Sequence, residues 1–190
     1  MTRLLASAAL LAVIPATALA ADATVIGDWL VKDGYANIRI DQCGGKMWGI
    51  VVWEKTPGLD TENPDPAKRS RPTLGMPVLM GLSPAKEPGK WSGEIYNSNN
   101  GKMYGATISL ADENTLDLEG CLVWPLCQTQ KWTRMKTPPP NAAPLPPIKS
   151  SPMPPAKQAA AKKGAATPPP SDVCLRVADE AAAQEKGAKK

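Results

Sequence analysis

Residues 102–123 read KMYGATISLADENTLDLEGCLV, in which two segments of alternating character flank the turn residues 112–114. Leu116 and Leu118 alternate with acidic residues, so in an extended chain the apolar side chains lie on one face and the carboxylates on the other. Asp and Asn in the connector favour a tight chain reversal. The stretch therefore predicts a β-hairpin with one buried and one solvated face.

The same pattern of short alternating segments and turn residues extends from Val25 to Met135. No amphipathic helical segment separates any two of these strands, which predicts an antiparallel meander. An eight-stranded meander can close into an up-and-down barrel, whose interior holds packed side chains or one small ligand. An open sandwich is the alternative. We predict an all-β, up-and-down barrel with strands at residues 25–32, 35–43, 47–55, 74–82, 90–97, 102–111, 115–123 and 126–135.

One connector, residues 56–73 (TPGLDTENPDPAKRSRPT), is much longer than the others. Long polar loops at a barrel mouth are favoured places for a binding site. The acidic residues lack the spacing of a calcium loop, so we predict no metal site. The charges could instead pair with one another and leave no group for a ligand. The ligand-binding candidates in this loop are Asp60, Asn63, Asp65, Arg69 and Arg71.

The N-terminal residues have the features of a secretory signal peptide. Arg3 precedes an apolar stretch at residues 4–14, and residues 18–20 are Ala-Leu-Ala. The apolar stretch is shorter than the roughly 20 residues that cross a bilayer, which argues against the alternative of a membrane anchor. We expect residues 1–20 to be removed near Ala20 and the mature protein to be periplasmic or secreted, without a transmembrane segment.

Composition separates one domain from a tail. Residues 21–136 hold all six tryptophans, with 13 basic and 14 acidic residues, whereas residues 137–190 contain no aromatic residue and 12 of the 21 prolines. The tail carries 8 basic and 4 acidic residues, so the positive charge of the chain belongs to it and predicts no nucleic-acid surface on the domain. We predict a disordered Pro/Ala/Lys-rich linker at residues 137–171 and a short helical segment at 172–190. The basic tail could contact an anionic component of the cell envelope.

A set of motifs occurs in order along the domain and resembles a known family. The chain is similar to the bacterial domain-of-unknown-function family 2147 over about residues 25–136. The resemblance implies an exported lipocalin-like β-barrel without an established activity. It rests on Gly27-Asp28-Trp29, Ile38-Arg39-Ile40, Cys43-Gly44, Gly49-Ile50-Val51-Val52-Trp53, Asp60-x-x-Asn63, Arg69-x-Arg71-Pro72-x-Leu74-Gly75, Trp91-x-Gly93-x-Ile95-Tyr96, Gly101-Lys102-x-Tyr104 and Gln130-x-Trp132-Thr133-Arg134.

The resemblance also implies how one end of the barrel closes. In lipocalin-like barrels a tryptophan on the first strand and an arginine on the last commonly stack as a cation over a ring. Trp29 and Arg134 occupy these positions, and Trp132 lies on the same strand face as Arg134. We expect the three side chains to seal one end; contact with a ligand is the alternative.

The four cysteines are expected to form disulfides, because the predicted compartment is oxidising and the chain has no C-x-x-C spacing. Cys121 and Cys127 are symmetric about a three-residue turn, which would place them opposite each other in a hairpin. Many relatives have a second cysteine about five residues after the first, but here that place falls on Trp48. We therefore hypothesise that Cys43 pairs with Cys174; free thiols or intermolecular bonds are the alternative.

The chain contains no histidine, which removes the commonest general base and the commonest zinc ligand. We expect a non-enzymatic barrel without a cofactor that binds a small apolar or amphipathic ligand, its open end near residues 56–73. Tyr104 is a further ligand-binding candidate, although aromatic residues on such strands more often pack in the core. The alternative is a structural or protein-interaction module of the cell envelope, with a packed barrel and a tethering tail.

Overall fold

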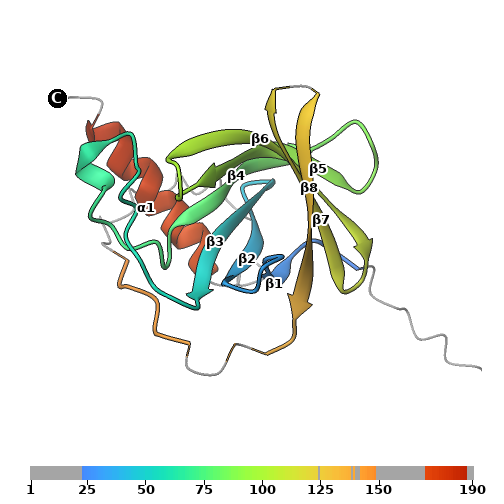
Figure 1. Cartoon of the computed structure of the whole chain (residues 1–190), viewed down its shortest axis with the longest axis horizontal. Helices are drawn as coiled ribbons and strands as arrows, with labels where there is room; N and C mark the ends of the chain where they lie inside the picture. Colours follow the sequence, from blue (N-terminus) through green and yellow to red (C-terminus); the bar gives the residue numbers. More distant parts are fainter. Residues whose placement is uncertain (1–22, 124, 138, 140–141, 149–169, 188–190) are drawn as a thin grey trace, which may run out of the picture.

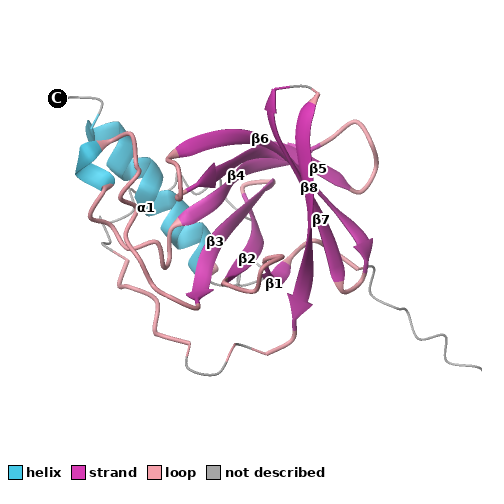
Figure 2. Cartoon of the chain, viewed as in Figure 1, coloured by secondary structure: helices cyan, strands magenta, loops and turns pink. Residues whose placement is uncertain are grey.

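The fold is a closed barrel of eight antiparallel strands with one helix on its outside (Figures 1 and 2). The computed structural model describes residues 23–123, 125–137, 139, 142–148 and 170–187. Each strand pairs with its neighbours in sequence, and β1 closes the barrel against β8. The predicted up-and-down barrel is confirmed. The elements are β1 (Gly27–Leu30), β2 (Ala36–Cys43), β3 (Lys46–Glu54), the short 3-10 helix η1 (Pro66–Lys68), β4 (Pro77–Pro84), β5 (Lys90–Asn97), β6 (Lys102–Asp112), β7 (Thr115–Val123), β8 (Leu126–Met135) and α1 (Asp172–Gly187).

The strand boundaries follow the alternation of the sequence closely, with the largest difference at β4. That strand was predicted from residue 74 but begins at Pro77. Gly75 has a φ of +84°, a left-handed conformation that interrupts an extended strand. The N–H of Met76 donates to the carbonyl of Thr73, which completes a turn before the strand starts.

Arg134 closes one end of the barrel. Its guanidinium carbon lies 4.1 Å from the ring centroid of Trp29, the residue with which it pairs across β1 and β8. The same guanidinium donates hydrogen bonds to the carbonyls of Thr24, Ile26 and Glu113, at 2.6, 2.9 and 2.6 Å. One side chain thus joins the N-terminal segment, the β6–β7 turn and the last strand, and the ring beneath it is fully buried.

The helix α1 packs on the outer face of β2, β3 and β4 (Figure 1). Ile50 and Val173 are both fully buried, and neither belongs to the core cluster inside the barrel. Ser171 begins the helix, because its hydroxyl accepts a hydrogen bond from the N–H of Cys174 at 3.4 Å. A helix of this length is marginal by itself, so its contacts with the barrel are what hold it in place.

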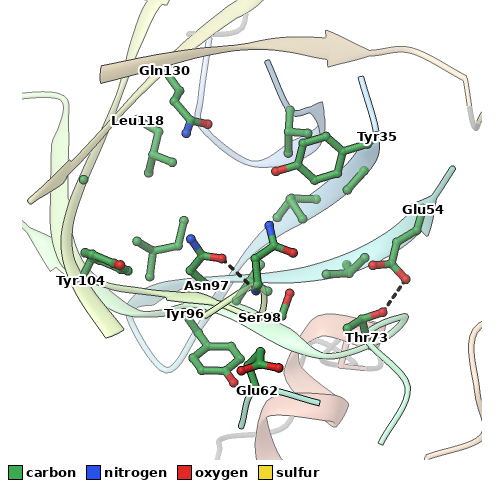
Figure 3. A pocket seen from close by; sticks show the side chains of 18 of the residues that line it. Tyr35, Glu54, Glu62, Thr73, Tyr96, Asn97, Ser98, Tyr104, Leu118 and Gln130 are labelled. Atoms are coloured by element: carbon green, nitrogen blue, oxygen red, sulfur yellow. Dashed lines mark hydrogen bonds between the residues drawn. The ribbon is translucent and has the colours of Figure 1, made fainter. Parts of the chain in front are cut away.

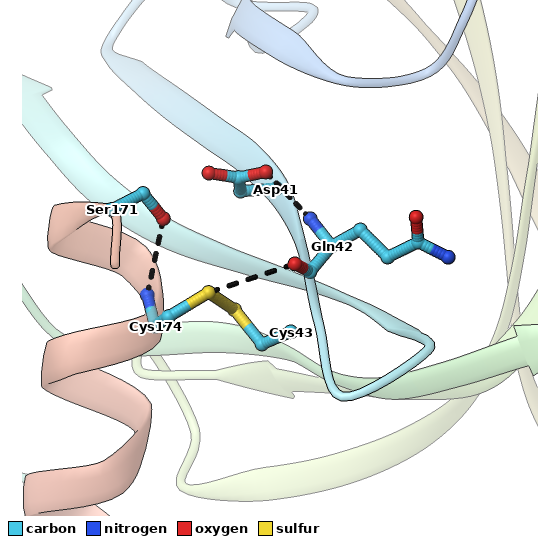
Figure 4. The surroundings of a disulfide bond; sticks show 5 residues. All are labelled: Asp41, Gln42, Cys43, Ser171 and Cys174. Atoms are coloured by element: carbon cyan, nitrogen blue, oxygen red, sulfur yellow. Dashed lines mark hydrogen bonds between the residues drawn. A yellow bond between two sulfur atoms is a disulfide. The ribbon is translucent and has the colours of Figure 1, made fainter. Parts of the chain in front are cut away.

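Two disulfides are present. Cys43, at the end of β2, bonds to Cys174 in the first turn of α1 across 131 residues of sequence (Figure 4). Cys121 bonds to Cys127 across the β7–β8 hairpin, where the two residues are paired in register. Disulfides persist in oxidising compartments, so both bonds indicate a location outside the cytoplasm.

Parts of the expected tail and leader lie outside the described residues. Residues 1–22 and 149–169 belong to this group, so the structure does not describe the signal peptide or most of the linker. Residues 142–148 have no regular secondary structure, and Arg176 of α1 donates to the carbonyl of Pro146. Within the described ranges, no helix has both the length and the apolar character needed to cross a membrane.

Candidate functional site

The barrel contains a cavity of about 990 Å³ that opens at the end opposite Arg134. The β1–β2, β3–β4 and β5–β6 connections contribute residues to the lining at this open end, and β7 and β8 contribute Leu122 and Leu126 beside the turn that joins them. Ligand pockets in proteins typically have volumes of roughly 300–1,000 Å³. The deeper wall is apolar and comes from strands on all sides of the barrel, through Ile38, Val51, Val78, Ile95, Leu118 and Trp132.

A ring of polar side chains (Figure 3) lines the cavity toward its open end, together with the exposed apolar side chains of Leu59, Leu122 and Leu126. Tyr104 lies in this ring, as expected of a ligand-binding candidate, and Asn97 and Gln130 face the same space from β5 and β8. Gln130 is on the same strand face as Trp132, whose indole N–H donates to the Gln130 carbonyl oxygen at 3.3 Å. Trp132 lines the cavity and belongs to the same core cluster as Trp29, whereas Arg134 stacks on the Trp29 ring.

The loop between β3 and β4 forms one side of the mouth, with Leu59 and Glu62 in the lining. The hydroxyl of Thr73 donates to the Glu54 carboxylate at 2.7 Å, where the loop rejoins the barrel. Burial raises the pKa of Glu54 above its ordinary value, although hydrogen bonds from Thr73 and from the backbone of Gly58 oppose the shift. The long loop is thus part of the cavity wall.

The loop candidates Asp60, Asn63 and Arg71 are joined to one another rather than turned toward the cavity. Asp60 is fully buried and accepts three hydrogen bonds. Its partners are the Tyr96 hydroxyl at 2.7 Å, the Asn63 amide at 2.6 Å and Arg71 Nε at 2.9 Å. Burial, together with the hydrogen bond to Asp60, raises the pKa of Tyr96 to about 12. This buried cluster fastens the loop to β5.

The cluster continues outward to the helix. Glu180 of α1 accepts hydrogen bonds from Lys68 at 2.6 Å and from Arg71 Nη1 at 3.0 Å. Burial opposes the charge on Glu180, but Lys68 and Arg71 outweigh this effect and hold the pKa of the carboxyl below its ordinary value. Arg71 therefore links Asp60 to Glu180, and through them the barrel, the loop and the helix.

The two remaining loop candidates have local roles. Asp65 accepts a hydrogen bond from the N–H of Ala67 at 3.0 Å and caps η1. Arg69 donates to the carbonyl of Asn63 at 2.8 Å. The charges of the loop thus order the loop itself, in agreement with the alternative that they pair with one another.

Gly101 allows the β5–β6 hairpin to touch this loop. Its φ is +67°, and a Cβ at this position would overlap the carbonyl oxygen of Glu62. Gly89 has a similar φ of +77°, but a Cβ there would meet no atom within 4 Å. An alanine substitution at Gly89 therefore measures the free-energy cost of the left-handed backbone conformation alone. The same substitution at Gly101 adds the cost of the overlap with Glu62.

We expect Gly89→Ala to lower the free energy of unfolding by about 1 kcal/mol, the cost of a left-handed alanine. Gly101→Ala should cost about 2 kcal/mol more, because the added methyl also forces the hairpin away from the loop. Urea unfolding of both variants measures the difference. Equal losses would mean that the hairpin and the loop do not press against each other.

Sequence reasoning missed the polar residues inside the barrel. Gln128 and Gln130 alternate with outward residues and share the inward face with Trp132, which is a detectable signal. The sequence pattern alone does not mark these glutamines as cavity residues, because polar residues on a strand normally lie on the solvated face. Here the inward face of β8 carries Gln128 and Gln130 between the buried Trp132 and the exposed Leu126.

Within the described ranges, one group of side chains has the spacing of a metal site: Glu119, Cys121 and Cys127. Both cysteines are in the disulfide, so their sulfurs are not available as thiolate ligands.

A family model described as an uncharacterized protein conserved in bacteria (DUF2147) matches residues 27–134. No curated protein matches the sequence. Among solved structures, protein HP1028 from the human pathogen Helicobacter pylori, described as belonging to the lipocalin family, has a TM-score of 0.54. The match has 19% sequence identity and covers 58% of this chain and 82% of that chain, so it supports the fold alone. The family match spans the whole barrel, and this chain belongs to the DUF2147 family of uncharacterised bacterial proteins with a lipocalin-like fold.

Proposed function

We propose that this protein is a non-enzymatic carrier or receptor that binds a small apolar or amphipathic molecule inside its barrel. The observation that supports the proposal is the cavity of about 990 Å³, closed below and open at one end. Its deeper wall consists of buried apolar side chains, which favour an apolar group released from water. The absence of histidine from the sequence agrees with a binding role rather than hydrolysis.

The proposed place of action is the periplasm. The features of residues 1–20 resemble a cleavable export signal, and the two disulfides require an oxidising compartment to persist. Native mass spectrometry of protein isolated from its own host would identify a copurifying molecule, and N-terminal sequencing of the same sample would locate the cleavage near Ala20.

Gly120 offers a direct test of binding in the cavity. It lines the cavity on β7, and a Cβ at this position would meet no atom within 4 Å. Gly120→Trp should therefore fill the cavity without disturbing the strand. We expect the affinity for an environment-sensitive apolar dye to fall about tenfold or more, because the indole occupies the space that the dye needs.

Glu119→Trp is the matched control, because it adds the same side chain one residue away on the exposed outer face. Its dye affinity should equal that of the unmodified protein, and both variants should keep their unfolding free energy within about 0.5 kcal/mol. Dye titrations followed by fluorescence give the affinities. Equal dye binding by Gly120→Trp and Glu119→Trp would show that the dye binds elsewhere and would contradict the proposal.

A further inference from the structure

Three polar side chains that line the cavity, from β5, β6 and β8, each have an oxygen that accepts a hydrogen bond within the protein. The side-chain oxygen of Asn97 accepts from the N–H of Asn99 at 3.0 Å. That of Gln130 accepts from Trp132 at 3.3 Å, and the Tyr104 hydroxyl accepts from the Asn100 amide at 2.8 Å. Two amide NH₂ groups and one phenolic O–H are left to donate, from three different strands.

The charges around the cavity do not favour an anion. Its lining contains two carboxylates, Glu54 and Glu62, and a single cation, the exposed Lys55 next to Glu54. An anion that leaves water without a partner of opposite charge loses roughly several kcal/mol of solvation free energy, and repulsion from nearby carboxylates adds to this loss.

Every arginine in the described ranges is engaged away from the cavity. The guanidinium groups bond to carboxylates or to backbone carbonyls, and no arginine belongs to the lining. These pairs are Arg39 with Asp28, Arg69 with the Asn63 carbonyl, Arg71 with Asp60 and Glu180, Arg134 with the carbonyls at the closed end, and Arg176 with the Pro146 carbonyl.

A cation is not favoured either. The Glu54 carboxylate accepts from the Thr73 hydroxyl and lies next to Lys55, and Glu62 is exposed to water at the rim. Asn97, Tyr104 and Gln130 each present a donor to the cavity. Donors without a compensating cation suit an uncharged group that presents oxygen acceptors.

We propose that the ligand is an uncharged amphiphile, with an apolar body against the deeper wall and an oxygen-rich head group, such as hydroxyls, ethers or esters, that accepts hydrogen bonds from Asn97, Tyr104 and Gln130. This inference rests on the proposed function, because it names the ligand class of the same cavity.

Three amphiphiles with the same dodecyl chain test the head-group preference: the monododecyl ether of glycerol, dodecanoate and dodecyltrimethylammonium. Titration calorimetry with the full chain at neutral pH, below the concentrations at which they form micelles, compares their affinities. We expect the affinity for the glycerol ether to be at least about tenfold higher than for either ion. Only its head group accepts hydrogen bonds from the donors at the cavity without bringing a charge out of water.

Gln130→Lys tests the position of the head group. An ammonium group at the cavity should shift the ratio of dodecanoate to glycerol ether affinity about tenfold or more toward dodecanoate. Thr129→Lys adds the same charge at the neighbouring exposed position outside the lining, and should leave the ratio unchanged.

The outcomes separate the two proposals. Dodecanoate or the ammonium compound binding as tightly as the glycerol ether would overturn the head-group assignment while supporting a ligand-binding barrel. An unchanged ratio in Gln130→Lys would overturn the placement of the head group. If none of the three compounds binds, and apolar dyes also fail to bind, both the head-group inference and the proposed function are wrong.

Discussion

Asp60→Ala is expected to lower the free energy of unfolding by about 3–5 kcal/mol, the usual cost of removing one partner from a buried ion pair. Asp60 is fully buried, and its carboxylate accepts from Tyr96, Asn63 and Arg71. Alanine would leave these donors without their acceptor, two of them on buried side chains. Guanidinium unfolding followed by tryptophan fluorescence would measure the loss.

Two further variants test whether the loss of stability in Asp60→Ala comes from the buried hydrogen bonds of Asp60. Asp65→Ala removes a carboxylate from the same loop, but Asp65 is exposed and caps a single turn, so we expect a loss of about 1 kcal/mol. Asp60→Asn keeps an acceptor oxygen and should fall between the two. A loss for Asp60→Ala no larger than that for Asp65→Ala would show that the buried cluster contributes little to stability.

The double variant Cys43→Ser/Cys174→Ser is expected to release the helix α1 from the barrel. The bond closes a loop with a sequence separation of 131 residues. The chain-entropy model gives about 5 kcal/mol for a loop of this size. Val173 and Glu180 remain as contacts, but an isolated helix of this length is marginal in water.

Amide hydrogen exchange resolves this effect along the chain. In the double variant, amides of α1 should exchange much faster, while those of the barrel strands keep most of their protection, because the helix opens without the barrel. Lys68 and Arg71 lose their partner on the helix when it detaches, so the loop between β3 and β4 should also exchange faster.

The second disulfide provides the control. Cys121→Ser/Cys127→Ser opens a loop with a sequence separation of 6 residues, for which the same model gives about 2 kcal/mol. Its effect should be confined to the β7–β8 hairpin. Slow exchange in α1 after removal of the Cys43–Cys174 bond would mean that packing alone holds the helix.

Local patterns in the sequence were sufficient to predict where the strands lie. The alternation in residues 115–123 predicted β7 to the residue, and the turn at residues 112–114 placed the hairpin. These features depend on neighbours in the chain, because side chains of a strand alternate whatever the rest of the fold does. The start of β4 was less accurate, because Gly75 adopts a turn conformation within an apolar stretch.

The candidate site was harder to predict, because the role of a polar side chain depends on what lies opposite it. Asp60 could face a ligand or the loop, and the decision comes from Tyr96, which is 36 residues away. In the sequence, Gln130 has the pattern of a strand residue on the solvated face. In the closed barrel, the same face lines the cavity. Composition alone does not distinguish these environments.

The sequence by itself determined the eight strands and their order, since these follow from local alternation and turn chemistry. The family resemblance also pointed to Trp29 and Arg134 as the pair that stacks at the closed end. Only the tertiary structure decided that Arg71 reaches Glu180 across 109 residues, and it selected the Cys43–Cys174 bond from the alternatives that the sequence left open. Local sequence patterns do not predict contacts between residues so far apart, because these contacts depend on how the barrel and the helix lie in space. Closure of the barrel left an open cavity beside a packed apolar core, and the long loop is held at the rim by its own charges.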